Sequence, residues 1–109
     1  MDHWVRRHSA LTLSEAIRRL TSFPADLYRI PGRGRIKPNT FADLILFDPE
    51  TVGVSRSRRV KDLPGGASRL IRNPLGLKSV WVNGRQTFDG TNILPEGQGA
   101  GCVLDHFNA

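Results

Sequence analysis

Residues 32–49, GRGRIKPNTFADLILFDP, decide the fold of this chain. They combine a glycine-bounded basic loop, a turn signal at Pro38 and Asn39, and the longest apolar run in the sequence, residues 42–47, which an Asp-Pro pair closes. An apolar run of this length between turn residues is typical of a strand buried on both faces. We therefore predict a central strand over residues 42–47 and place the rest of the chain around it.

Residues 11–28 carry the clearest helical pattern of the chain. Thr12 and Glu15 have the T-x-x-E spacing of a capping box, and apolar residues follow at the spacing of one helix face. These apolar residues are Leu13, Ala16, Ile17 and Leu20. Because proline fits only the first turn of a helix, we expect Pro24 to end this helix and to begin a short second one over roughly residues 24–28.

The pattern after residue 31 becomes extended. Ile36 predicts a very short strand, which the turn at residues 37–40 folds back onto the apolar run. Further on, residues 80–82 are rich in β-formers, and the Asn-Gly pair that follows them is the strongest short hairpin signal. We therefore expect a return strand over residues 85–88.

Residues 50–69 lose the apolar periodicity. They include the basic segment from Arg56 to Lys61, whose role the sequence leaves open, and the turn signal Leu-Pro-Gly-Gly at residues 63–66. We predict a long excursion with little regular structure, of the kind that covers a neighbouring element or forms a partner surface.

The fold class expected from these patterns is mainly β with an N-terminal helix, that is α+β, in one compact unit. A helical segment takes residues 1–30 and a β-rich domain takes residues 31–109. A length of 109 residues suits one small domain, and eleven glycines with seven prolines favour several short strands over a helical bundle.

The composition limits the compartment. With one cysteine, no internal disulfide can form. No apolar run approaches the roughly 20 residues that a membrane helix needs, and the first ten residues lack the apolar core of a signal peptide. We expect a soluble cytoplasmic protein without membrane contact.

A net charge of +6 raises the alternative of a basic nucleic-acid-binding module. The arginines, however, occur in scattered pairs and do not follow one helix face. Aromatic residues make up only 7% of the chain, without a stacking pattern. We therefore weigh the sequence against a dedicated nucleic-acid module.

No catalytic, cofactor-binding or metal-binding residues emerge. The three histidines, His3, His8 and His106, form no zinc-binding motif, and Cys102 lies alone in a glycine-rich tail. The candidate for an anion contact is the pair Arg33 and Arg35, because a glycine-flanked guanidinium can approach a phosphate or carboxylate closely. The competing interpretation is a solvated turn.

Three stretches taken together resemble the C-terminal end of amidohydrolase-superfamily enzymes, most closely the N-acyl-D-amino-acid deacylase (D-aminoacylase) branch. They are LTLSEAIRRLTSFPADLY at 11–28, GRGRIKPNTFADLILFDPETV at 32–52 and DLPGGASRLIRNPLGLKSVWVNGR at 62–85. One departure is Asn39, which stands where the superfamily pattern usually has glycine. Asparagine also tolerates positive φ, so the turn should survive.

The resemblance implies a late helix followed by the C-terminal strands of a small β-sandwich. In such enzymes this region follows a catalytic (β/α)8 barrel, whose strands carry the metal ligands and the catalytic Asp, upstream of what corresponds to Met1. The chain is then expected to be a non-catalytic remnant without cofactor. Because a half-sandwich leaves strand edges uncovered, we expect a homo-oligomer. The alternative is a fragment or subunit of a metal-dependent deacylase, completed by a missing barrel chain.

Overall fold

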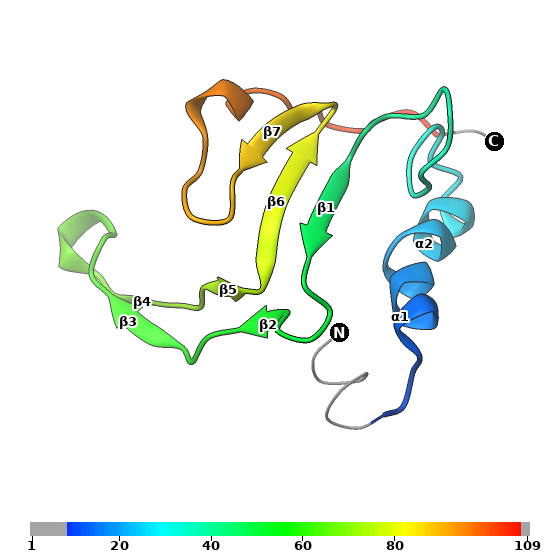
Figure 1. Cartoon of the computed structure of the whole chain (residues 1–109). Coiled ribbons are helices and arrows are strands. Elements are labelled where there is room, and N and C mark those ends of the chain that lie inside the picture. Colours follow the sequence, from blue (N-terminus) through cyan, green and yellow to red (C-terminus); the bar gives the residue numbers. More distant parts are fainter. Residues whose placement is uncertain (1–8, 108–109) are drawn as a thin grey trace.

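The computed structural model describes residues 9–107 of the chain (Figure 1). A bent helix precedes seven short strands, which form three open antiparallel sheets within these residues. The helices are α1 (Leu13–Leu20) and α2 (Ser22–Leu27), and short 3-10 turns are η2 (Pro64–Gly66) and η3 (Pro95–Gly97). The strands are β1 (Leu44–Phe47), β2 (Gly53–Val54), β3 (Arg58–Val60), β4 (Arg69–Ile71), β5 (Pro74–Leu75), β6 (Leu77–Val82) and β7 (Arg85–Phe88). The α+β class is thereby confirmed.

The helical prediction is confirmed at the first helix and shifted at the second. Thr12 is the N-cap of α1, and its side chain accepts a hydrogen bond from the main-chain N–H of Glu15 at 3.2 Å. The helix breaks at Thr21, and α2 begins at Ser22, two residues earlier than expected. Pro24 therefore lies inside the first turn of α2, where its missing N–H costs no hydrogen bond.

The main sheet has the strand order β1-β6-β7, so the apolar strand β1 lies at its edge. Leu44 pairs with Trp81 and Ile45 with Val80 in antiparallel register. Ile45 and Leu46 are 56% and 55% exposed, although neighbouring side chains of a strand point to opposite faces. The prediction of a central strand buried on both faces is therefore wrong for this chain, because β1 has one neighbouring strand and neither face is covered.

The hairpin of β6 and β7 is confirmed. Asn83 and Gly84 both take positive φ, 49° and 80°, as a two-residue turn between twisted strands requires. The side chain of Asp89 closes the next turn by accepting hydrogen bonds from the N–H groups of Thr91 and Asn92.

Two predictions for the loops are wrong. Ile36 forms no strand and is 89% exposed, because the N–H of Phe41 bonds the carbonyl of Gly32 and closes a wider loop around it. Residues 50–69 are not irregular: β2 pairs with β5, and β3 pairs with β4 in a ribbon whose tip is η2. The partner strands β4 and β5 follow the η2 turn, so the polar sequence of residues 50–69 alone does not predict the pairing.

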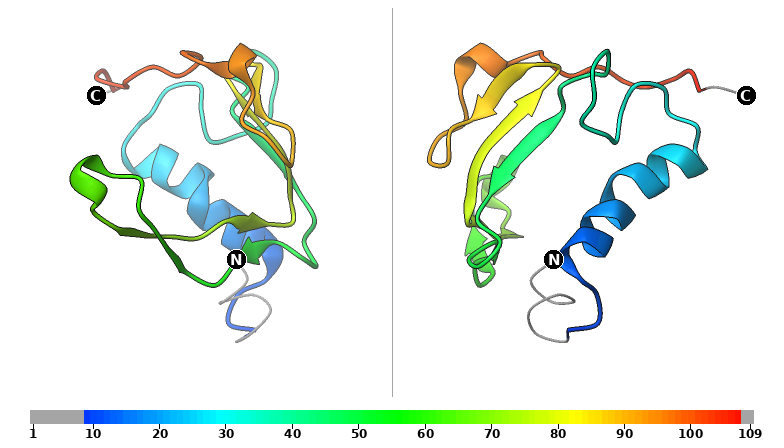
Figure 2. Two further views of the ribbon diagram at one scale, coloured as in Figure 1. Left: turned by 90° about the vertical axis from the view of Figure 1, so that its left-hand side faces the viewer. Right: turned by 45° about the vertical axis from the view of Figure 1, so that its right-hand side comes forward.

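The described residues form little hydrophobic core. Within residues 9–107 only Ala16, Ala25 and Ser79 are buried, and no large side chain is fully buried. The two helices follow one another along one side of the molecule and stand apart from the sheet (Figure 2). No helix in the described part of the chain is long and apolar enough to cross a membrane.

Candidate functional site

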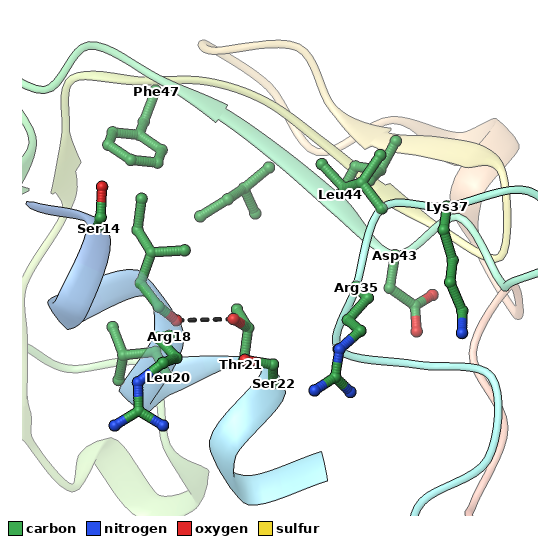
Figure 3. Close-up of a pocket in the computed structure, with 14 residues that line it drawn as sticks. Ser14, Arg18, Leu20, Thr21, Ser22, Arg35, Lys37, Asp43, Leu44 and Phe47 are labelled. Carbon is green, nitrogen blue, oxygen red and sulfur yellow. Dashed lines mark hydrogen bonds between the residues drawn. The ribbon is translucent and has the colours of Figure 1, made fainter. Parts of the chain in front are cut away.

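A groove lies between the helices and β1 and has a volume of about 660 Å³ (Figure 3). Ile17 and Leu20 line it from α1, Ile36 from the following loop, and Ile45 and Phe47 from β1. Leu44 of β1 lines it as well, whereas Leu46 does not. The groove is thus an apolar trough along an open strand edge, and we name it the α1–β1 groove.

The wall of the groove opposite β1 is held by the loop of residues 32–37. Gly34 takes φ +85°, and a Cβ at this position would lie 2.6 Å from the Cβ of Ala25 and 2.9 Å from the carbonyl oxygen of Thr21. Next to it, Arg35 forms two hydrogen bonds with the carboxylate of Asp26, at 2.7 and 2.6 Å. The Arg35 guanidinium holds the pKa of Asp26 below its ordinary value.

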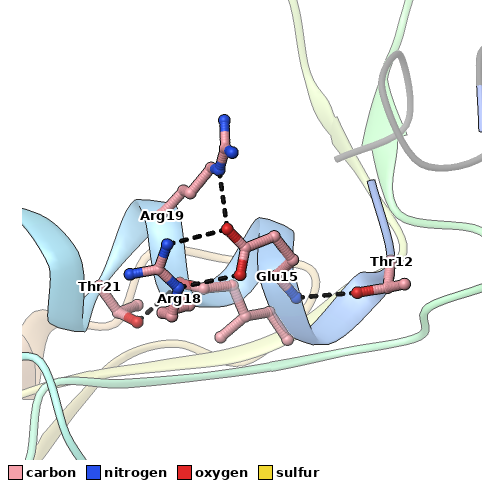
Figure 4. Close-up of polar contacts among 6 residues, drawn as sticks. Thr12, Glu15, Arg18, Arg19 and Thr21 are labelled. Carbon is pink, nitrogen blue, oxygen red and sulfur yellow. Dashed lines mark hydrogen bonds and ion pairs between the residues drawn. The ribbon is translucent and has the colours of Figure 1, made fainter. Parts of the chain in front are cut away.

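Helix α1 carries a charge cluster (Figure 4). Glu15 accepts hydrogen bonds from Arg18, at 2.8 and 2.9 Å, and from Arg19, at 2.9 Å. These hydrogen bonds lower the pKa of Glu15 from 4.5 to about 2. The guanidinium of Arg18 also lies 5.3 Å from the ring centre of Phe23, within cation–π range, and so links α1 to α2.

The second predicted anion contact, Arg33, lies at the other end of the loop. Its side chain is 13% exposed, forms an ion pair with Asp43 and stacks over Phe41 at 4.2 Å. It also donates to the sulfur of Cys102 at 3.8 Å. Arg33 and Arg35 are therefore not neighbours in one site, and each binds a carboxylate of the chain itself. Contact with an external anion stays a prediction.

The described residues provide no cluster of three or more His, Cys, Asp or Glu side chains that could hold a metal ion. Cys102 is exposed, and His106 forms a hydrogen bond with the adjacent Asp105. His3 and His8 lie outside the described residues.

Residues 1–88 match the family model described as "Amidohydrolase family". The chain belongs to the amidohydrolase family. It is 35% identical over 95 residues to an N-acyl-D-aspartate deacylase of Alcaligenes xylosoxydans xylosoxydans, which is 87% of this chain and 17% of that protein. No solved structure matches the chain.

Two further relatives come from the same organism. An N-acyl-D-glutamate deacylase is 33% identical over 88 residues, covering 81% of this chain and 16% of that protein. A D-aminoacylase is 29% identical over 104 residues, covering 95% of this chain and 19% of that protein. The resemblance to the D-aminoacylase branch is thereby confirmed, and the chain spans less than a fifth of the length of these relatives.

Sequence reasoning missed the α1–β1 groove. Two signals for it were present: an amphipathic helix with one apolar face, and a strand whose consecutive residues are all apolar. The described residues do not bury the apolar face of α1 or the apolar side chains of β1. The groove lies where these two exposed apolar surfaces face each other.

Proposed function

We propose that this chain is a non-catalytic C-terminal β domain of the amidohydrolase type, and that its function is to assemble with a second copy of itself through β1 and the α1–β1 groove. In this proposal the sheet β1-β6-β7 is one half of a small sandwich, and the partner supplies the cover.

The observation that carries the proposal is the surface of the chain. Its accessible area of 8509 Å² compares with about 6000 Å² for a compact monomer of this mass. Its radius of gyration of 16.4 Å compares with about 13 Å for a compact domain of this length. A chain that leaves so much surface exposed gains stability when another polypeptide covers it.

The edge strand β1 is the part of that surface best suited to pairing. It is the sequence Leu-Ile-Leu-Phe, without the lysine, proline or inward-pointing charge that usually protects an edge. A second β1 strand would satisfy the unpaired main-chain groups of this edge, and the rest of the partner would pack against the faces that carry Ile45 and Leu46. A two-fold axis at this edge closes the assembly, so that no new edge is left at the contact.

A second candidate function rests on the relatives. Because all three are deacylases of N-acyl-D-amino acids by name, the chain could serve as one piece of such a hydrolase, with its catalytic barrel in another polypeptide. The partner in the α1–β1 groove would then be that barrel-bearing chain. Activity, substrate and metal would all belong to the complete enzyme.

Sedimentation velocity at micromolar protein concentration tests self-association. We expect a dimer or larger species for the unchanged chain, and a shift to monomer for Ile45→Lys and for Leu46→Lys. Ile93→Lys is the matched control, because Ile93 is also exposed but lies far along the chain from the groove. A well-folded monomer for the unchanged chain would overturn the proposal.

A metal analysis with an N-acyl-D-aspartate hydrolysis assay separates the two candidates. We expect neither bound zinc nor turnover from this chain alone. Turnover by this chain alone would contradict a non-catalytic role, whereas turnover that appears only with a barrel-bearing chain would support the second candidate.

A further inference from the structure

The basic ribbon, which we define as residues 54–73, concentrates the positive charge of the chain. It holds six of the sixteen Lys and Arg residues and one of the ten acidic residues. Twenty residues thus carry a surplus of five positive charges, while the whole chain has a formal net charge of +6. The exposed cations are Arg56, Arg58, Arg59, Lys61, Arg69 and Arg72.

Most of this charge has no carboxylate partner among residues 9–107. Arg69 pairs with Asp62 at 2.7 and 2.6 Å, and Arg59 donates to the neutral hydroxyl of Ser68 at 3.1 Å. The other four cations form no ion pair with any described residue. By contrast, the arginines at positions 18, 19, 33 and 35 all bind carboxylates of the chain. Ion pairs within the described residues therefore leave most cations of the basic ribbon available to an external anion.

The pairing of β3 with β4 sorts the cations onto two faces. Arg59 lies opposite Leu70 in the register, and Arg58 lies opposite Ile71. Because side chains alternate along a strand, the Asp62–Arg69 pair falls on the face of Arg58. Leu70 lies on the face of Arg59, and the same alternation, continued one residue beyond each strand, places Lys61 and Arg72 there too. That face presents three cations without a carboxylate, around a leucine that is 63% exposed.

The basic ribbon also projects from the body of the molecule. Figures 1 and 2 show β3, β4 and the η2 tip extending away from the main sheet and from the helices. A two-stranded ribbon is one of the two elements that the major groove of duplex DNA, about 12 Å wide, admits. Arginine and lysine are common donors to the phosphate oxygens that position a protein on a duplex.

We propose that the basic ribbon binds the phosphate backbone of double-stranded nucleic acid, without regard to base sequence. Residues 54–73 contain no aromatic side chain, so they lack the stacking platform typical of single-strand binders. The same absence removes the aromatic anchors with which proteins hold a lipid interface. The inference is independent of the proposed assembly, since the basic ribbon and the α1–β1 groove share no residue.

Fluorescence anisotropy with a labelled DNA duplex of mixed sequence tests the inference with two triple variants. The first, Arg59→Gln with Lys61→Gln and Arg72→Gln, removes the cations of one ribbon face. The matched control, Arg29→Gln with Lys78→Gln and Arg85→Gln, removes three exposed cations that lie outside both the basic ribbon and the α1–β1 groove and leaves the same net charge. Circular dichroism verifies that both variants keep the fold.

We expect the unchanged chain to bind the duplex and the ribbon variant to lose about tenfold or more in affinity, with a loss several-fold smaller for the control. Three to five phosphate contacts predict a log–log salt slope of about −3 to −4.5 between about 50 and 200 mM salt, and the ribbon variant should lose about three units of it. Failure to bind at low salt, equal losses in both variants, or preference for polyglutamate or anionic vesicles over the duplex would each overturn the inference.

Discussion

Asp43 joins two segments that are forty residues apart, because its carboxylate accepts a hydrogen bond from the main-chain N–H of Asn83 at 2.9 Å. The other oxygen of the same carboxylate pairs with Arg33. One side chain thus connects the loop before β1 to the β6–β7 hairpin. Partial burial raises the pKa of Asp43, but the hydrogen bond from Asn83 and the Arg33 guanidinium outweigh it and hold the pKa below its ordinary value.

Substituting Asp43 should destabilise the chain. Asp43→Ala leaves the mostly covered Arg33 guanidinium without its carboxylate and the Asn83 N–H without its acceptor, so we expect a loss of about 1 to 3 kcal/mol in the free energy of unfolding. Urea unfolding followed by circular dichroism measures it. Asp105→Ala is the control, because Asp105 is well exposed. An equally large loss of stability there would show that the contacts of Asp43 with Arg33 and Asn83 contribute nothing particular.

Stability should fall in acid. The pKa of Glu15 in the folded chain is about 2, against an ordinary value of 4.5. A carboxyl whose pKa is lowered on folding stabilises the fold fully above its ordinary pKa, and this contribution disappears as the pH falls through the folded value. The melting temperature should therefore decrease from pH 4.5 toward pH 2. The pKa values of Asp26, Asp43, Asp48, Asp62 and Asp89 are lowered as well.

The Glu15 part of this pH dependence can be isolated. Glu15→Gln should flatten the acid decrease, whereas Glu96→Gln, which changes an exposed residue of η3, should leave its slope unaltered. A carbon NMR titration of the Glu15 carboxyl reports its pKa directly. A midpoint at the ordinary value would contradict the arginine contacts that Figure 4 shows.

Removing the α1 cap should weaken the helix. Thr12→Ala deletes the oxygen that accepts from the N–H of Glu15, and a lost cap typically costs about 1 kcal/mol. We expect that loss in urea unfolding, with Thr12→Ser close to the unchanged chain because serine caps equally well. If both substitutions had the same effect, the hydroxyl would not be the stabilising group.

Gly76 should tolerate no side chain. It lies between β5 and β6 at φ +69°, and a Cβ there would come within 2.5 Å of the main-chain nitrogen of Val52. Gly76→Ala should cost about 1 to 3 kcal/mol. Gly65 has nearly the same φ but nothing within 4 Å, so Gly65→Ala isolates the backbone strain. Equal costs at the two positions would show that contact with Val52 is unimportant.

The features that could be predicted from the sequence are local ones. The Thr12 cap, the Asn83 turn and the return strand β7 depend on residues within a few positions of each other, and short-range steric and hydrogen-bonding rules determine them. The family resemblance was equally accessible, because it rests on the order of residues and not on their contacts.

The candidate site could not be predicted in the same way. An uninterrupted apolar run such as Leu-Ile-Leu-Phe indicates a strand with apolar side chains on both faces. It does not indicate whether other residues of this chain bury those side chains. The α1–β1 groove separates the helices from the sheet, and the loop around Gly34 and Arg35, which contacts the helices, forms part of its lining. That separation depends on contacts between elements and has no periodic signature.

By itself, the sequence determined the α+β class, the helix cap, the β6–β7 hairpin and the family. Tertiary structure alone decided that β1 is an exposed edge, that Arg33 and Arg35 bind different carboxylates, and that the basic segment before the turn at residues 63–66 pairs with the segment after it. The physical reason is that propensity and turn chemistry act over a few residues, whereas strand order and charge pairing depend on which distant segments meet in space.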